Sequence, residues 1–209
     1  GRDVNNREKG ILHFEKTGEF DPRSNYAFGE GGAGTFSDGK LYTQTRDPRL
    51  RKVLEELVEA GGDPSLLYRQ KAHIGTDVLR SVVVKIRQKI LSLGGEIRFE
   101  SRCTGLAVDQ GRLCGVQVND AELIPTDVAV LAVGHSARDT FRMLHQTGVR
   151  LEQKPFSMGV RIEHPQELID LSQYGSLEYR GQLGAAEYKL SHRCQDGRGV
   201  YTFCMCPGG

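Results

Sequence analysis

FGEGGAGTFSDGKL, at residues 28–41, is the stretch from which the fold of this chain can be inferred. Five of its fourteen residues are glycine, and most of the others are small or polar. Glycine permits positive φ angles and lets the backbone approach a neighbouring group closely. Successive backbone N–H groups in such a segment can form a concave nest that suits phosphate oxygens. The composition therefore predicts a loop that binds an anionic ligand.

Side chains in this stretch support the binding interpretation. Two hydroxyls and an ammonium group add hydrogen-bond donors, from Thr35, Ser37 and Lys40. A flexible surface linker is one alternative, but Gly- and Ser-rich linkers seldom carry apolar anchors such as Phe28, Phe36 and Leu41. A glycine-rich turn that serves only close packing is another alternative. The stretch is not a Walker A loop, because the Gly-Lys-Ser/Thr ending is missing.

The composition is that of an ordinary globular protein. The 209-residue chain is 38% apolar and 26% charged, with a formal net charge of +1. This charge balance gives no reason to expect nucleic acid or a membrane surface as a partner. No apolar run approaches the ~18 residues that span a bilayer, and the sequence does not open with a signal peptide. We therefore expect a cytoplasmic protein.

The cysteines indicate free thiols rather than a disulfide framework, because their number is odd. They are Cys103, Cys114, Cys194, Cys204 and Cys206. The best candidate for a metal site combines H-x-C at 192–194 with C-x-C at 204–206. Structural zinc sites usually space cysteines as C-x2-4-C, and residues at i and i+2 of a strand do not converge well on one ion. We therefore expect no metal, and small buried thiols on one strand face are the simpler interpretation.

Apolar residues recur at helical spacing in several segments. They predict helices at 3–16, 47–61 and 76–93, and shorter ones after residue 139 and at 165–171. Asp47 and Pro48 are expected to begin the second helix as its cap and first residue, and Thr76 is expected to cap the third. Residues 63–68 predict a further turn or short helix.

Short strands are predicted at 96–100, 103–108, 113–118 and 128–133, with a hairpin turn at 109–112. The run VAVLAV at 128–133 is entirely apolar, which is typical of a strand buried on both faces of a parallel sheet. Further candidates make the later part strand-rich, at 149–152, 156–163, 188–190 and 200–206. Helices that lead into strands indicate an α/β fold, to which the hairpin adds a small antiparallel β-layer.

The sequence resembles one known family along essentially its whole length. The segments that carry the resemblance are FGEGGAGTFSDGKL at 28–41, HIGTD at 73–77, GHSARDT at 134–140, KPFSMGVRIEHPQ at 154–166 and YTFCMCPGG at 201–209. They are similar to the uncharacterised FAD-dependent dehydrogenases, or NAD(FAD)-utilising dehydrogenases, of the glutathione-reductase-like flavoprotein superfamily. The resemblance implies a Rossmann-like FAD/NAD(P)-binding domain with FAD as cofactor, and NAD(P)H as a further candidate electron donor or acceptor.

Proteins of this kind begin with a strand, a G-x-G-x-x-G turn and an acidic residue that binds the ADP ribose. This sequence does not show those three features in that arrangement. The resemblance therefore implies an incomplete Rossmann-like domain in a chain taken from the middle of a longer protein, either a fragment or a truncated product. It implies a partial FAD-binding domain at 1–148, a strand-rich substrate or insert lobe at 149–203, and a return toward the FAD domain at 204–209. Without the helix N-terminus that holds the pyrophosphate, the chain alone is expected to bind FAD poorly and to be inactive.

The resemblance also implies cofactor contacts for individual residues. Along the ribityl-pyrophosphate and near the isoalloxazine, these would be Gly31, Gly32, Gly34, Thr35, Ser37, Gly39 and Lys40. Cys103 would meet the adenine through its backbone, with a buried structural thiol as the alternative. Gly134 is similar to the last residue of the superfamily's Ala-Thr-Gly turn. Gly208 and Gly209 would lie where the family's chain returns to the flavin.

His135 and Arg138 are the expected catalytic residues, because they follow the apolar run 128–133 and ligands bind beyond the carboxyl ends of strands. A histidine can supply a proton near neutral pH, and an arginine can orient a carboxylate through two parallel hydrogen bonds. Ser136 would contact the same ligand or cap the following helix. A weaker group, for which structural roles are equally open, consists of His73, Arg161, Glu163 and His164.

Two functions follow from these observations. The first is an FAD-dependent oxidoreductase, a dehydrogenase that acts on a small-molecule substrate the sequence does not identify. The second is a non-catalytic truncated flavoprotein fragment or binding module that cannot hold FAD alone. Nucleophilic hydrolysis is disfavoured, because Ser136 lacks a G-x-S-x-G setting. The sequence predicts neither the electron acceptor nor the oligomeric state.

Overall fold

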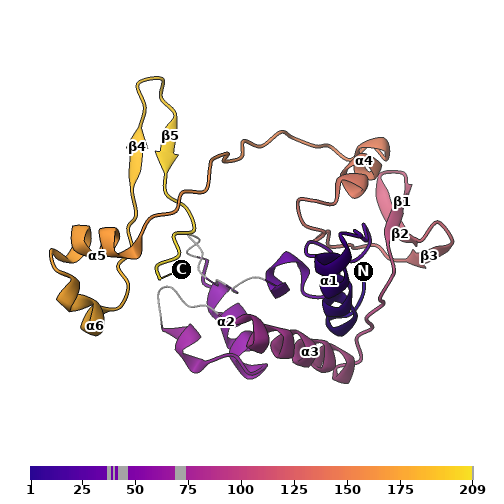
Figure 1. The fold of residues 1–209 in the computed structure, drawn as a ribbon. Helices are drawn as coiled ribbons and strands as arrows, with labels where there is room; N and C mark the ends of the chain where they lie inside the picture. The colour runs from indigo at the N-terminus through magenta and orange to yellow at the C-terminus, as the bar shows by residue number, and fades with distance from the viewer. Residues whose placement is uncertain (37–38, 40, 42–46, 69–73, 209) are drawn as a thin grey trace. The chain divides into compact units, whose positions relative to one another are not determined.

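A computed structural model of the protein describes residues 1–36, 39, 41, 47–68 and 74–208 (Figure 1). The chain divides into two compact units, Gly1–Glu152 and Gln153–Gly209. Helices and strands are both present, which confirms the mixed α/β class. The strands of the described residues form two antiparallel sheets, one of three strands and one of two. None of the helices in the described ranges is long and apolar enough to cross a membrane.

The first unit begins with helix α1, Val4–Thr17, which confirms the helix predicted at 3–16. The Asp3 carboxylate caps its N-terminus by accepting two backbone N–H groups. Gly18, with a φ of 76°, ends the helix in the left-handed conformation. The buried face of α1 carries Val4, Arg7 and Ile11 at positions i, i+3 and i+7. An arginine therefore occupies the middle of an otherwise apolar stripe.

Helices α2, Leu50–Glu59, and α3, Thr76–Ser92, follow in the same unit, and the 3-10 helix η2, Pro64–Leu67, lies between them in the sequence. All three occupy segments for which helical structure was predicted. A small core fixes this part of the fold. Its buried members are Leu66, Ile74 and Leu79, and the partly buried Leu41, Leu57, Val58 and Val83 pack against them.

The predicted beginnings of α2 and α3 are wrong by one or two residues. Helix α2 starts at Leu50, because the Asp47 carboxylate accepts the N–H of Arg49 at 2.9 Å and forms a turn that precedes the helix. Gly75, rather than Thr76, occupies the cap position of α3. At α2, a local side chain-to-backbone hydrogen bond therefore sets where the helix begins within a correctly predicted segment.

The three-stranded sheet consists of β1, Cys103–Asp109, β2, Arg112–Val118, and β3, Glu122–Pro125, in the order β1-β2-β3. This sheet confirms the predicted hairpin, and β3 is an addition that the sequence analysis missed. Gln110 and Gly111 both have positive φ angles, of 47° and 80°, so the two-residue turn suits the twist of the paired strands.

The apolar run at 128–133 is not a strand, which contradicts the prediction of a buried parallel strand. Val128 and Val130 are 73% and 88% exposed. The strands of the described residues pair only with one another, in the two antiparallel sheets. None of them forms backbone hydrogen bonds with this run as a neighbouring strand. An extended segment needs a neighbouring strand for its backbone hydrogen bonds. The Rossmann-like fold is therefore not confirmed.

The predicted strands at 96–100 and 149–152 are also absent. Between them, helix α4, Arg138–Gln146, forms where a helix was predicted and buries Thr140 and Leu144. Helices satisfy their own backbone hydrogen bonds, whereas strands depend on neighbours. This difference explains why the helix prediction is confirmed and the strand predictions beside it are wrong.

The second unit combines short helices with a hairpin. The helices are α5, Gln166–Tyr174, η3, Leu177–Tyr179, and α6, Arg180–Leu183, of which only α5 was predicted. The hairpin pairs β4, Ser191–Arg193, with β5, Gly199–Tyr201, so its strands are shorter than the predicted ones or displaced from them. The predicted strand at 156–163 does not form, and its Phe156 is 81% exposed.

Ion pairs join α2 to α3 in the first unit. The Lys89 ammonium lies 2.6 Å from a Glu56 carboxylate oxygen and 2.7 Å from one of Glu59. The other Glu56 oxygen lies 2.7 Å from the ammonium of Lys52. Hydrogen bonds from Lys52 and Lys89 lower the pKa of Glu56 to about 2. A glutamate with a lowered folded-state pKa stabilises the fold above its ordinary pKa, and this contribution is lost as the pH falls through the folded-state value.

The variant Glu56→Gln is expected to be less stable than the unsubstituted chain at pH 6, because the pairs with Lys52 and Lys89 are lost. The difference should shrink as the pH falls from about 4.5 toward 2, because the native glutamate then becomes protonated too. Urea unfolding at a series of pH values measures this difference. Glu55, whose partner Arg51 lies on α2 itself, supplies the control Glu55→Gln. A Glu56→Gln deficit of the same size at every pH would contradict the prediction.

The exposed run at 128–133 is expected to make the isolated chain prone to aggregation, because an apolar extended segment can pair with another copy. Val130→Lys should slow light-scattering growth of this chain several-fold, because the charge opposes such pairing. Asp127→Lys reverses a charge next to the run, a larger change in net charge than Val130→Lys, without interrupting the run, so it is the control for net charge. Equal aggregation rates for Val130→Lys and the unsubstituted chain would rule this explanation out.

Candidate functional site

The glycine loop, residues 25–36, follows α1 and includes the 3-10 helix η1, Gly32–Phe36. Asn25 shapes its beginning: the amide oxygen of this buried side chain accepts the N–H of Ala27 at 2.8 Å and of Phe28 at 3.3 Å. The Asn25 N–H donates to the carbonyl of Phe28 at 3.3 Å. Hydrogen bonds between residues close in sequence therefore shape the beginning of the loop.

The guanidinium of Arg7 holds the loop to α1. This side chain is fully buried, and its terminal nitrogens donate to four backbone carbonyl oxygens of the loop. The acceptors are Asn25 at 2.9 Å, Tyr26 at 3.3 Å, Gly32 at 3.0 Å and Glu30. Burial lowers the pKa of Arg7, and the negative charge of Glu30 opposes this shift. The remaining nitrogen, Nε, is buried without a hydrogen-bond partner.

Glu30 connects the loop to two helices. Its carboxylate accepts the N–H of Val4, at the first turn of α1, at 2.8 Å, where the helix dipole favours a negative charge. The same carboxylate lies 3.2 Å from the guanidinium of Arg87 on α3. The backbone N–H of Glu30 donates to the carbonyl of Arg2 at 2.9 Å. The loop is thus fixed on both sides by charged groups that are mostly buried.

The predicted site glycines fall into two classes. Gly31 and Gly39 are required by packing: an added Cβ would lie 2.0 Å from the Thr35 hydroxyl at Gly31 and 2.0 Å from the Ile74 carbonyl at Gly39. At Gly32 and Gly34 an added Cβ would meet no atom within 4 Å. These two positions present bare backbone to open space, which suits close approach by a ligand such as FAD.

Other predicted members of the loop serve its shape or cannot be placed. Thr35 is fully buried, and its hydroxyl donates to the Glu30 carbonyl at 3.2 Å. It therefore acts within the loop. Ser37, Lys40 and Gly209 lie outside the described residues, and so does His73.

A cavity of about 370 Å³ lies next to the loop and is lined in part by Glu30 and Gly31. Apolar side chains of α3, including Val83 and Ile86, form much of its wall, and Arg87 adds a positive charge. Arg87 also lies over the ring of Phe99 at 5.5 Å from the ring centroid. On this side the loop faces α3, because Glu30 and Gly31 line the cavity together with side chains of that helix.

The corner at 134–138 carries the predicted catalytic residues. Gly134 has a φ of 75°, and an added Cβ there would meet no atom within 4 Å. His135 and Arg138 are exposed on either side of Ser136 and the buried Ala137. Ser136 does not cap α4 with its side chain; instead its carbonyl accepts the N–H of Arg138 at 2.9 Å. The corner is open, so a ligand can reach it without displacing protein atoms.

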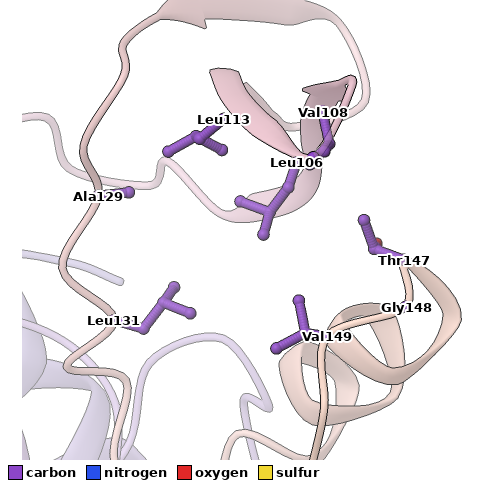
Figure 2. A pocket seen from close by; sticks show the side chains of 9 residues that line it. Leu106, Val108, Leu113, Ala129, Leu131, Thr147, Gly148 and Val149 are labelled. Carbon is purple, nitrogen blue, oxygen red and sulfur yellow. The ribbon is translucent and has the colours of Figure 1, made fainter.

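A second cavity, of about 470 Å³, lies between the β1–β2 hairpin, the run at 128–133 and the end of α4 (Figure 2). Leu106 and Leu113 face Leu131 and Val149 across it. Most of the side chains that line it are apolar. Neither this cavity nor the one beside Gly31 is lined by both Gly32 and Gly134, so a shared flavin site for these glycines stays a prediction.

The five cysteines are thiols rather than disulfides. The partly buried Cys103 lies at the start of β1, with its sulfur 3.8 Å from the carbonyl of Gly105. In the parts of the chain that the structure describes, no three His, Cys, Asp or Glu residues are placed to hold a metal ion. Among the weaker candidates, His164 contacts the hydroxyl of Tyr188 at 2.9 Å, and Arg161 and Glu163 are exposed.

The second unit fastens Gly208 through a polar network on α5. The Gly208 N–H donates to the Gln166 amide oxygen at 2.8 Å, and the Gln166 amide nitrogen donates to the Asp170 carboxylate at 2.6 Å. Asp170 is fully buried and also accepts the N–H of Ala186 at 2.7 Å. These hydrogen bonds, led by the one from Ala186, lower the pKa of Asp170. Arg180 lies 3.3 Å from its second oxygen.

Sequence reasoning missed the polar residues that hold these segments, namely Arg7, Glu30, Gln166 and Asp170. One signal was available in α1, where Arg7 replaces an apolar residue in the buried stripe. A charged residue in such a position needs a polar partner. The partners are backbone carbonyls, which carry no sequence signature.

Comparison with known proteins supports a flavoprotein relationship. Residues 155–209 match the family model described as FAD-dependent protein, C-terminal domain-like. A protein of Clostridium beijerinckii, described as uncharacterized, is 47% identical over 210 residues, which covers 100% of this chain and 39% of the relative. The chain thus spans about two fifths of the relative's length. At this coarse level, residues 155–209 are similar to a family of FAD-dependent proteins.

The variant Asp170→Ala is expected to destabilise the second unit, because it leaves the Ala186 N–H without its acceptor and removes one of the two acceptors of the Gln166 amide nitrogen. Since the pKa of Asp170 is lowered, its contribution is present above the ordinary aspartate pKa and is lost as the pH falls through the folded value. Protease sensitivity of 166–208 at pH 7 and at low pH measures the effect. Glu167→Ala, an exposed change on the same helix, is the control, and equal sensitivity of both variants would contradict the prediction.

Proposed function

We propose that this chain contributes cofactor-binding and substrate-facing residues to an FAD-dependent oxidoreductase whose substrate is a small molecule. The observation that carries the proposal is the open backbone face at Gly32 and Gly34, on a loop that buried charges already hold in place. The family match at 155–209 supports FAD as the cofactor. A loop with a fixed shape and no side chains on one face is suited to a flat or anionic ligand.

Several residues would hold the cofactor under this proposal. The residues along its phosphates and ribityl chain would be Gly32, Gly34, Ser37 and Lys40. The packing that keeps this part of the loop in shape would come from Gly31, Thr35 and Gly39. The backbone of Cys103 would meet the adenine, and Gly134, Gly208 and Gly209 would approach the flavin. FAD, when bound, supplies the ability to accept a hydride from a substrate or to pass it on, with NAD(P)H as a candidate partner.

His135 and Arg138 are proposed to act on the substrate. The imidazole of His135 would give or take a proton at one ring nitrogen near neutral pH. The guanidinium of Arg138 would orient a carboxylate through paired hydrogen bonds. Their exposure at an open corner supports this proposal, because a substrate can reach both side chains.

The second candidate function is a non-catalytic flavoprotein fragment or binding module that cannot hold FAD alone. The exposed apolar run at 128–133 favours it for the isolated 209 residues, because the sheet it is suited to is not formed. We propose that residues outside these 209, which the longer relative has room for, supply the remaining strands. Both candidate functions place an FAD site on this chain. They differ in whether the 209 residues alone are enough to bind FAD.

The test uses the protein at its full natural length and the 209-residue chain, each purified and incubated with FAD. We expect flavin absorption to stay with the full-length protein after gel filtration and little to stay with the short chain. Flavin retained by both proteins would favour the first candidate alone. A full-length protein that stays colourless would overturn the proposal.

Gly34→Ala makes the test specific for the loop. The added Cβ meets no atom within 4 Å, and φ of Gly34 lies outside the left-handed region, so stability should not fall. FAD affinity of the full-length protein should fall at least about tenfold, because the methyl group occupies the space proposed for the ligand. Gly181→Ala, at an equally open position on α6, is the matched control. Unchanged FAD affinity in Gly34→Ala would contradict the proposed place of the cofactor.

A further inference from the structure

Among the described residues, the buried guanidinium of Arg7 forms no ion pair. The negative charge of Glu30 favours the charged form of Arg7, but the Glu30 carboxylate makes its contacts with Val4 and Arg87. Burying a charge is costly unless hydrogen bonds compensate for the lost water. Here the compensation comes from four carbonyl oxygens and from the ring of Phe36, whose centroid lies 4.9 Å from the guanidinium carbon. All of these groups belong to the glycine loop.

The direction of these carbonyls fixes the direction of the loop's donors. The described chain contains no cis peptide bond, so the C=O of one residue and the N–H of the next point in opposite directions. The carbonyls of Glu30 and Gly32 point to Arg7. The N–H groups of Gly31 and Ala33 therefore point away from it. One side chain thus sets the orientation of two alternate peptide units.

The geometry points to Arg7 as a positioning residue that preforms the glycine loop for the phosphate groups of a dinucleotide, an inference that rests on the proposed function. N–H groups turned away from a buried cation are free of its repulsion, and both of these N–H groups lie on the side of the loop opposite Arg7, where an anionic ligand would bind. Because Arg7 is itself buried behind the loop, it does not touch the ligand. It acts by removing the cost of ordering the loop when the ligand arrives.

Arginine is specifically suited to this role. Its planar group carries five N–H donors in a fixed fork, so its two terminal nitrogens reach four carbonyls at once. A lysine offers three donors at a single point and cannot span the same acceptors. Gly29 leaves room for the side chain, because a Cβ at that position would lie 2.2 Å from the Arg7 Cδ atom.

The experiment compares Arg7→Lys and Arg7→Ala with Arg51→Ala, an exposed change on α2, in the protein at its full natural length. Hydrogen exchange without FAD reports the order of the loop, and FAD titration reports affinity. In both Arg7 variants we expect faster exchange confined to residues 25–36, with α3 and the β1–β2 hairpin unchanged. FAD affinity should fall at least about tenfold. Arg51→Ala should change neither quantity.

Chemical rescue separates positioning from general stability. Guanidinium ion, at concentrations far below those that unfold proteins, should enter the space left in Arg7→Ala and restore part of the loop protection and of the FAD affinity. It should not improve Arg7→Lys, whose side chain still occupies that space. Urea at the same concentration is the control, because it carries no charge.

Failure of this inference and failure of the proposed function give different results. Unchanged exchange at 25–36 in the Arg7 variants overturns the inference whether or not FAD binds, and so does a loosened loop with unchanged FAD affinity. An unsubstituted protein that does not bind FAD overturns the proposed function, and a loosened loop in that case still upholds Arg7 as the residue that sets the loop's shape. If Arg7→Ala is unfolded as a whole, the inference is tested with Arg7→Lys by the same two measurements, hydrogen exchange of residues 25–36 and FAD affinity.

Discussion

An extended backbone segment needs a neighbouring strand to complete its hydrogen bonds, and this constraint decides which parts of the chain acquire regular structure. The β1–β2 hairpin forms because each strand finds its partner after a two-residue turn. The run at 128–133 has a stronger apolar pattern than either strand, yet it stays unpaired and exposed in the described structure. Sequence preference alone does not create a strand when no partner is present.

The same constraint explains which predictions from the sequence succeeded. Helices α1 to α5 satisfy their own backbone groups, so periodic apolar residues and caps located each of them within a few residues. The hairpin was predictable because Gly111 marks its turn. Strands that depend on distant partners, at 128–133 and 156–163, were predicted from composition and do not form. The Rossmann-like sheet that they implied remains unconfirmed for the same reason.

The candidate site was predictable in part. Glycine content identified the loop at 28–41, and the structure separates Gly32 and Gly34, which face open space, from Gly31 and Gly39, which packing requires. Composition cannot make that distinction, because both classes look alike in a sequence. The residues that hold the loop escaped prediction because their partners are backbone atoms, whose positions only the folded chain defines.

Each unit uses a buried charged side chain where regular strand pairing is lacking. In the first unit, Arg7 donates to carbonyls of the glycine loop; in the second, Asp170 accepts the Ala186 N–H and, through Gln166, fastens Gly208. Irregular backbone leaves polar groups without ladder partners, and a buried ion with several hydrogen bonds satisfies many of them at one point. Such an arrangement orders glycine-bearing segments without covering them with side chains. It therefore combines two properties that are otherwise in conflict at a binding loop: a fixed backbone shape and a bare surface that a ligand can approach.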